Sequence, residues 1–210
     1  TIPGEKISFE AKMSISNAGK NGMFNAVSLV TFKNIENKVE QDLNYKKDNR
    51  GISKDQWLIE KGERFYHKDS FEFKVETLGV LKNSEIMRQA CLKIINNIEN
   101  VFNDTFTYTK SKTTLENSFD ITIKNDDYTI GKLFECVLFK QYYEKNKILN
   151  YVGFRKKHPH DDDSIIRISF KNDETGEKCV ELFKEVGQIL IKIFNDIKLK
   201  FGDSEVEQNS

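Results

Sequence analysis

Residues 119–138 read FDITIKNDDYTIGKLFECVL, and within this stretch the spacing of apolar residues changes from every second to every third or fourth residue. Apolar and polar residues alternate from Phe119 to Ile123, which indicates a half-buried strand. Residues 125–127 are typical of a turn, and Thr129 is placed to cap the amphipathic helix that the wider spacing predicts. A strand followed directly by such a helix indicates an α+β unit.

The remainder of the second half is expected to complete this unit with two strands and one long helix. The strands are predicted at residues 148–154 and 165–170, and the helix at residues 177–201. At about 1.5 Å per residue this helix would span about 37 Å, which exceeds the width of so small a unit. Part of its apolar stripe must therefore pack against another element.

The first half shows the same mixture of strands and helices. Strict alternation of apolar and polar side chains predicts a half-buried strand at residues 7–16. Further strands are predicted at residues 24–32 and 71–77. The charged residues 35–69 between them are expected to form a surface excursion with short helices, held in place by Trp57.

The two long helices of the chain are expected to pair with each other. The first, at residues 84–102, carries a continuous apolar stripe, as the final helix does. The contacts are assigned to five apolar residues, Ile94, Ile98, Leu190, Ile193 and Ile197. The predicted fold is α+β, with two units that each combine a small antiparallel sheet with a long helix and that pair helix to helix. The units are expected at residues 1–104 and 119–210, joined by a linker at residues 105–118 that contains an extended piece at residues 105–109.

Composition narrows the functions open to this chain of 210 residues. Its 33 basic and 33 acidic residues give a formal net charge of zero, which argues against tight unassisted binding to polyanionic DNA. Hydrophobic residues make up 38% of the chain, enough to bury a core without a metal or disulfide staple. Cys91, Cys136 and Cys179 are widely spaced, so we expect reduced, buried helix residues in a reducing compartment.

The most suggestive polar cluster is the run from His158 to Asp163, which reads HPHDDD. Histidine and aspartate side chains bind divalent metals, so His158, His160 and Asp161 to Asp163 could serve a metal-dependent enzyme. Consecutive residues around Pro159 point in different directions, however, and a solvated turn between two strands is the simpler interpretation. The two interpretations differ in whether these side chains converge.

Other catalytic motifs are absent from the sequence. It contains no GxxxxGK[ST] phosphate loop, no GxGxxG motif, no GxSxG nucleophile elbow and no carboxylate triad of the DxDGD kind. No run approaches the ~20 apolar residues of a membrane span. We therefore expect no catalytic residue, no cofactor, no bound metal and no membrane contact.

One turn and helix of the second half resemble a signature of the small alpha-like subunit of multisubunit RNA polymerases. In that family an acidic residue precedes His-Thr-Leu-Gly-Asn-Leu, which opens a helix, and residues 125–133 are similar to this segment. The positions that match are Thr129, Gly131 and Leu133. The positions that depart from the family are Tyr128, Ile130 and Lys132.

The following strands resemble the same family. Residues 151–159 are similar to its Gly-Tyr and His-Pro segment, and residues 166–168 to its closing strand. The matching motif residues are Gly153, His158 and Pro159. The resemblance implies that His158 and Pro159 belong to a turn, which lowers the weight of the metal interpretation.

The first half resembles the large alpha-like subunit of the same polymerases. Residues 71–81 are similar to that family's Phe-x-Phe-x-Val-Glu-Ser/Thr-x-Gly strand, with Glu76 and Gly79 at matching positions. Residues 19–27 are similar to its Gly-Lys-Glu-His-Ala-Lys-Phe-Ser-Pro-Val loop. Gly19, Lys20, Phe24 and Val27 match, whereas the His-Ala pair and the Pro are lost and one residue is deleted. The resemblance implies that Gly19, Lys20 and Phe24 approach the second-largest, catalytic subunit.

Taken together, the resemblances imply a fusion of the end of the large alpha-like subunit with the whole small one, as in nucleocytoplasmic large DNA viruses. Such a subunit performs no chemistry and acts in transcription as an assembly platform. The implied partners are the second-largest catalytic subunit, small zinc-binding subunits and the missing N-terminal part of the large alpha-like subunit. The implied localisation is the virion and the host cytoplasm for a viral protein, and otherwise the nucleus. Alternatives are the metal-dependent enzyme and a free-standing protein-binding adaptor.

Overall fold

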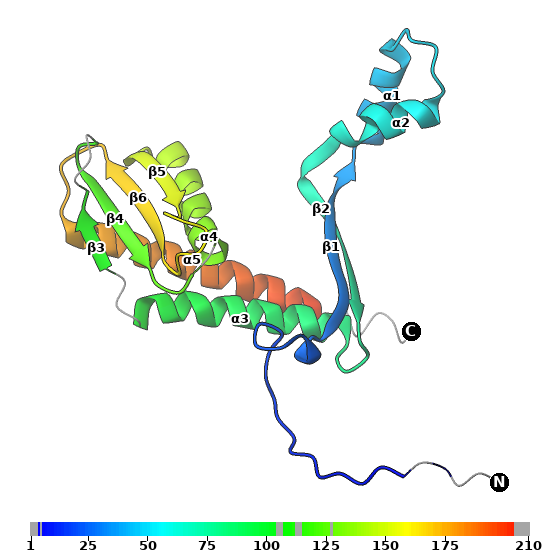
Figure 1. Cartoon of the computed structure of the whole chain (residues 1–210). Helices are drawn as coiled ribbons and strands as arrows, with labels where there is room; N and C mark the ends of the chain where they lie inside the picture. The colour runs from blue at the N-terminus through cyan, green and yellow to red at the C-terminus, as the bar shows by residue number, and fades with distance from the viewer. Residues whose placement is uncertain (1–3, 5, 104–106, 112–114, 127, 204–210) are drawn as a thin grey trace. The chain divides into compact units, whose positions relative to one another are not determined.

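The structure is a computed structural model that describes residue 4 and residues 6–103, 107–111, 115–126 and 128–203 (Figure 1). Its helices and antiparallel strands confirm the α+β class. Internal contacts divide the chain into two units, Thr1–Asn83 and Ser84–Ser210. The division falls well before residue 104, because the first long helix packs into the core of the second unit.

The first unit is built on a two-stranded antiparallel ribbon. Strand β1 (Val27–Glu36) pairs with β2 (Tyr66–Thr77), with Phe32 opposite Phe73. Because successive side chains of a strand point to opposite faces, one face of the ribbon is apolar and the other is polar. On the polar face Lys33 pairs with Glu72 at 3.2 Å.

Two short helices connect these strands, as expected for residues 35–69. Helix α1 (Lys38–Lys47) and helix α2 (Lys54–Lys61) are followed by a 3₁₀ turn, η2 (Gly62–Arg64). Trp57 of α2 is buried, stacks on Phe65 with ring centroids 5.7 Å apart, and donates its indole N–H to Asp48 Oδ2 at 2.9 Å. The predicted anchoring role of Trp57 is confirmed.

The strand predicted at residues 7–16 does not form. Residues 6–16 have no regular secondary structure, and their apolar side chains are exposed, with Ile7 at 83% and Met13 at 94%. A period of two describes an extended chain, but a strand also needs a neighbour to pair with. The chain then enters a 3₁₀ turn, η1 (Gly22–Phe24), and β1 begins at Val27 instead of Phe24.

The second unit contains a four-stranded antiparallel sheet in the order β3-β4-β6-β5. The strands are β3 (Thr107–Lys110), β4 (Ser118–Ile123), β5 (Leu149–Arg155) and β6 (Ser164–Phe170). The predicted linker at 105–118 therefore contributes an edge strand, although residues 105, 106 and 112–114 lie outside the described residues. Asp120 of β4 and Arg167 of β6 lie opposite each other and form a two-bonded ion pair at 2.6 and 2.7 Å.

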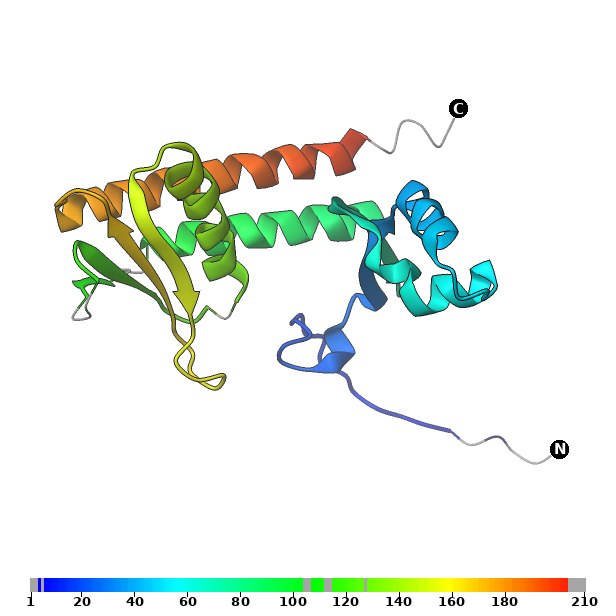
Figure 2. The same ribbon diagram turned by 90° about the horizontal axis from the view of Figure 1, so that it is seen from above.

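Helices supply the rest of the second unit. They are α3 (Asn83–Asn103), α4 (Thr129–Val137), the π-helix η3 (Leu138–Lys145) and α5 (Gly176–Asp203). Figures 1 and 2 show α3 and α5 side by side along much of their length. One apolar cluster joins residues of β4, β6, α4 and both long helices. Cys91 and Cys179 are buried as expected, but Cys136 is exposed because it lies on the outer side of α4.

Candidate functional site

Helices α3 and α5 form the first surface to which the sequence assigned a function. The ring of Phe102 on α3 lies against Gly187 of α5, where a Cβ atom would overlap it. The same ring packs on Phe183 with centroids 6.2 Å apart, and Phe183 in turn stacks on Phe134 of α4 at 4.2 Å. The two long helices therefore pack on each other within the second unit.

The predicted contact residues divide into two groups. Ile98 and Leu190 are fully buried in the same cluster, and Ile94 packs against it. Ile193 and Ile197 are 42% and 37% exposed and do not belong to the buried cluster. Their exposure follows from helix geometry: beyond Leu190, it is Ile191 and Phe194 that turn toward the cluster instead.

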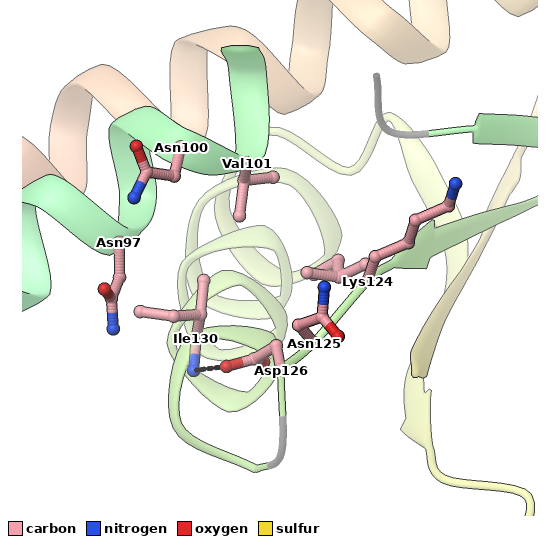
Figure 3. Close-up of a pocket in the computed structure, with 8 residues that line it drawn as sticks. Asn97, Asn100, Val101, Lys124, Asn125, Asp126 and Ile130 are labelled. Carbon is pink, nitrogen blue, oxygen red and sulfur yellow. Dashed lines mark hydrogen bonds between the residues drawn. The ribbon is translucent and has the colours of Figure 1, made fainter. Parts of the chain in front are cut away.

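The turn before α4 is the second candidate, and Figure 3 shows it as part of a pocket of about 170 Å³. The carboxylate of Asp126 accepts hydrogen bonds from the backbone N–H groups of Ile130 at 3.2 Å and Gly131 at 2.8 Å. Thr129 was expected to cap this helix, but Tyr128 occupies the N-cap position and makes no side-chain cap. Sequence reasoning missed Asp126, although a carboxylate before a helix is a recognisable cap.

The pocket around this turn is lined by both polar and apolar residues and has few charged groups. Asn97 and Asn100 of α3 face Lys124, Asn125 and Asp126 across it (Figure 3). A helix N-terminus attracts anions through its free N–H groups, but here the carboxylate of Asp126 already holds two of them. The arrangement stabilises the start of α4 and leaves little basis for an anion site.

The motif glycines have packing roles. Gly131 lies so close to the ring of Phe154 on β5 that a Cβ atom would overlap the ring. The neighbouring Lys132 places its ammonium 5.4 Å from the centre of that ring, and Glu135 accepts the Phe154 amide at 2.9 Å. Gly153 similarly makes room for the ring of Tyr151. The contacts of Gly131, Lys132 and Glu135 with Phe154, together with the half-buried Leu133, fix α4 against the sheet.

The run from His158 to Asp163 forms the turn between β5 and β6. The backbone N–H of His160 donates to Nδ1 of His158 at 3.1 Å, which occupies one of the two nitrogens with which His158 could bind a metal. Asp163 instead accepts a bond of 3.4 Å from the backbone of Asn125. Among the residues that the structure describes, no three His, Cys, Asp or Glu side chains gather to hold a metal ion.

The segments that resemble the large alpha-like subunit cover much of β2 and the turns next to the ribbon. Gly79 adopts φ +91°, a conformation that glycine tolerates without strain. The exposed Glu76 pairs with Lys74 at 2.9 Å. Gly19 and Lys20 lie in an exposed turn closed by a bond from the Lys20 N–H to the Asn17 carbonyl at 3.0 Å, while Phe24 in η1 is half-buried.

A second exposed apolar surface of the first unit, besides residues 7–15, is one that the sequence did not single out. The apolar face of the ribbon, hereafter the ribbon face, consists of Val30, Phe32, Phe71 and Phe73. Phe32 stacks on Phe73 with centroids 5.8 Å apart, yet the two side chains remain 68% and 58% exposed. The sequence predicted strands at residues 24–32 and 71–77, but it did not indicate that this face would stay open.

Two ionisable groups in the core of the second unit, Cys179 and Tyr142, have raised pKa values. Burial raises the pKa of the Cys179 thiol to about 12, and burial with a hydrogen bond to Glu185 raises the pKa of Tyr142 to about 12. Both groups therefore keep their protons at neutral pH. A thiol or hydroxyl that acts as an activated nucleophile requires a lowered pKa instead.

Comparison with known proteins adds no assignment. None of the helices in the described part of the chain combines the length and the apolar character that a bilayer span requires. Neither a scan against models of known protein families nor a search of curated proteins found a match to this chain.

Proposed function

We propose that this chain is a non-catalytic assembly subunit of a viral DNA-directed RNA polymerase. In this proposal the end of a large alpha-like subunit is fused to a small alpha-like subunit, and the fused chain acts in transcription by holding other subunits. The motif resemblances supply the polymerase assignment. The observation that carries the assembly role is the open ribbon face.

A two-stranded ribbon by itself is marginally stable in water, because it buries little apolar surface. Here four large apolar side chains line one face and stay exposed, while the opposite face carries the Lys33–Glu72 ion pair and is suited to water. Contiguous exposed apolar surface of this kind marks a protein-interaction site. We assign the ribbon face to contact with the second-largest catalytic subunit.

The packing of α3 on α5 supports the dimerisation part of the proposal. Under this assignment α3 belongs to the large alpha-like part, residues 1–104, and α5 to the small alpha-like part, residues 119–210. Their contact through Phe102 and Gly187 is then the contact between the two fused subunits. Small zinc-binding subunits and the missing N-terminal part of the large subunit complete the proposed partners, in the virion and the host cytoplasm.

Co-purification with the polymerase tests the proposal. A tagged chain should bring down the catalytic subunits, and Phe32→Glu should abolish this because a charge on the ribbon face would have to be buried unpaired. Thr31→Glu, the adjacent position on the polar face, is the matched control and should retain the complex. Equal recovery with both variants would remove the ribbon face from the interface.

The loop that resembles the family's contact loop is tested separately. The double variant Lys20→Ala with Phe24→Ala should weaken recovery of the catalytic subunits if this loop contacts them. The isolated chain should neither polymerise nucleotides nor bind DNA tightly at physiological salt, because a net charge of zero supplies little counterion release. A stable partner that contains no polymerase subunit would identify a free-standing adaptor instead.

A further inference from the structure

The N-terminal segment, residues 6–16, has the alternating sequence pattern of a strand but pairs with no other strand in the described structure. Its odd-numbered residues from Ile7 to Ile15 are all apolar, and its even-numbered residues from Ser8 to Ser16 are all polar. In the structure the segment is extended and unpaired, with Phe9 at 78% exposure. Nothing in the described structure uses its apolar side.

The nearest acceptor in the same unit would be the free edge of β1, and the segment does not occupy it. Strand β1 pairs with β2 alone, so its other edge is open among the described residues. Adjacent antiparallel strands are usually joined by about two to five residues. Here residues 17–26 intervene and are taken up by their own turn and by η1, which favours an acceptor elsewhere.

We infer that residues 6–16 are a donor strand that adds to the open edge of a β-sheet in a partner protein. Addition of an extended peptide to a sheet edge satisfies the backbone groups through ladder hydrogen bonds, while alternate side chains enter the partner's core. The odd-numbered residues would pack on the partner's apolar layer. The polar side carries one acidic residue, Glu10, and one basic residue, Lys12, among serines, and would face water.

This inference rests on the proposed function only for the identity of the partner, which would be a subunit of the polymerase. The pattern itself demands a sheet, because helix or membrane docking would require apolar residues at every third or fourth position. A segment of this length can form a full edge strand, since strands in globular proteins average about five to six residues.

Cysteine scanning with a maleimide distinguishes the possible states, in a Cys136→Ser background that removes the exposed native thiol. In the isolated chain Lys12→Cys and Met13→Cys should label at similar rates. In the purified complex labelling of Met13→Cys should slow at least tenfold, while Lys12→Cys should change less than threefold. The pair Ser14→Cys and Ile15→Cys should repeat this alternation.

Each other outcome overturns a defined part of the reasoning. A polymerase complex in which neighbouring positions are equally protected, or equally free, refutes strand donation but leaves the proposed function. Alternating protection in a complex without polymerase subunits supports strand donation and refutes the proposed function. A disulfide in the isolated chain between Ala11→Cys and Val30→Cys, but not between Lys12→Cys and Val30→Cys, would show that β1 is the acceptor and refute donation to a partner. A chain that assembles with no other protein refutes both strand donation and the proposed function.

Discussion

Replacement of Leu190 by alanine tests the packing of α5 most directly. Leu190 is 2% exposed and belongs to the same buried cluster as Ile98. Truncation of a buried leucine loses the transfer free energy of its side chain and leaves a cavity, at a combined cost of about 2–5 kcal/mol. We therefore expect the free energy of unfolding of the second unit to fall by about 3 kcal/mol, which corresponds to a Tm lower by about 10 °C.

The same helix offers a matched control. Leu199 is 62% exposed, so Leu199→Ala should change stability by no more than about 0.5 kcal/mol. Trp57, the single tryptophan, lies in the first unit, so its fluorescence follows that unit, whereas far-UV circular dichroism follows both. Urea unfolding of Leu190→Ala should shift the dichroism transition and leave the fluorescence transition in place.

Two results would refute the reasoning. Equal effects of Leu190→Ala and Leu199→Ala would show that α5 is not buried as described. An equal shift of the Trp57 transition would show that the chain unfolds as one unit. A double-mutant cycle of Phe102→Leu with Phe183→Leu then isolates the α3–α5 contact, and we expect a coupling energy of about 0.5–1.5 kcal/mol.

Three further predictions concern the turn before α4 and the thiols. Asp126→Ala should lower the free energy of unfolding by about 1 kcal/mol because two helix N–H groups lose their acceptor, whereas Thr129→Ala should have little effect in the same urea titration. In the native protein a thiol reagent should modify Cys136 rapidly and Cys91 and Cys179 only after unfolding, so a count of more than one fast thiol would contradict the described burial. Above pH 9 the unfolded chain loses the Cys179 proton, while the folded chain, in which the thiol has a pKa of about 12, keeps it. The free energy of unfolding should therefore fall as pH rises from 9 toward 12, by at most about 1.4 kcal/mol per pH unit. Cys179→Ala should reduce this fall.

Sequence periodicity correctly predicted the elements whose regularly spaced apolar residues are buried in the core. Strands β4 and β6 and helix α5 were expected within a few residues of their observed bounds, because each has a regular apolar pattern that the core uses. The exposure of Cys136 could also have been predicted from the sequence. The predicted α4 stripe of Ile130, Phe134 and Val137 places position 136 on the outer side of the helix.

The features that sequence reasoning missed depend on partners distant in the chain. Residues 105–109 were expected only as an extended piece of the linker, and the sequence did not predict that β3 joins the sheet with Tyr108 opposite Ile121 of β4. The strand predicted at residues 7–16 does not form for the opposite reason: its apolar and polar residues alternate strictly, but no neighbouring strand pairs with it among the described residues. Likewise the ribbon face could be predicted as apolar but not as open.

The distinction between packing and contact residues limits what the family resemblance can support. Gly131 matches the small-subunit signature, but its place against Phe154 gives it a sufficient reason in the fold, because any Cβ there would overlap the ring. The same holds for Gly79, whose positive φ favours glycine regardless of any partner. Such residues favour a shared fold and say little about a shared partner. The case for assembly must therefore come from surface that the fold leaves unexplained, and the exposed Phe32 of the ribbon face is such surface.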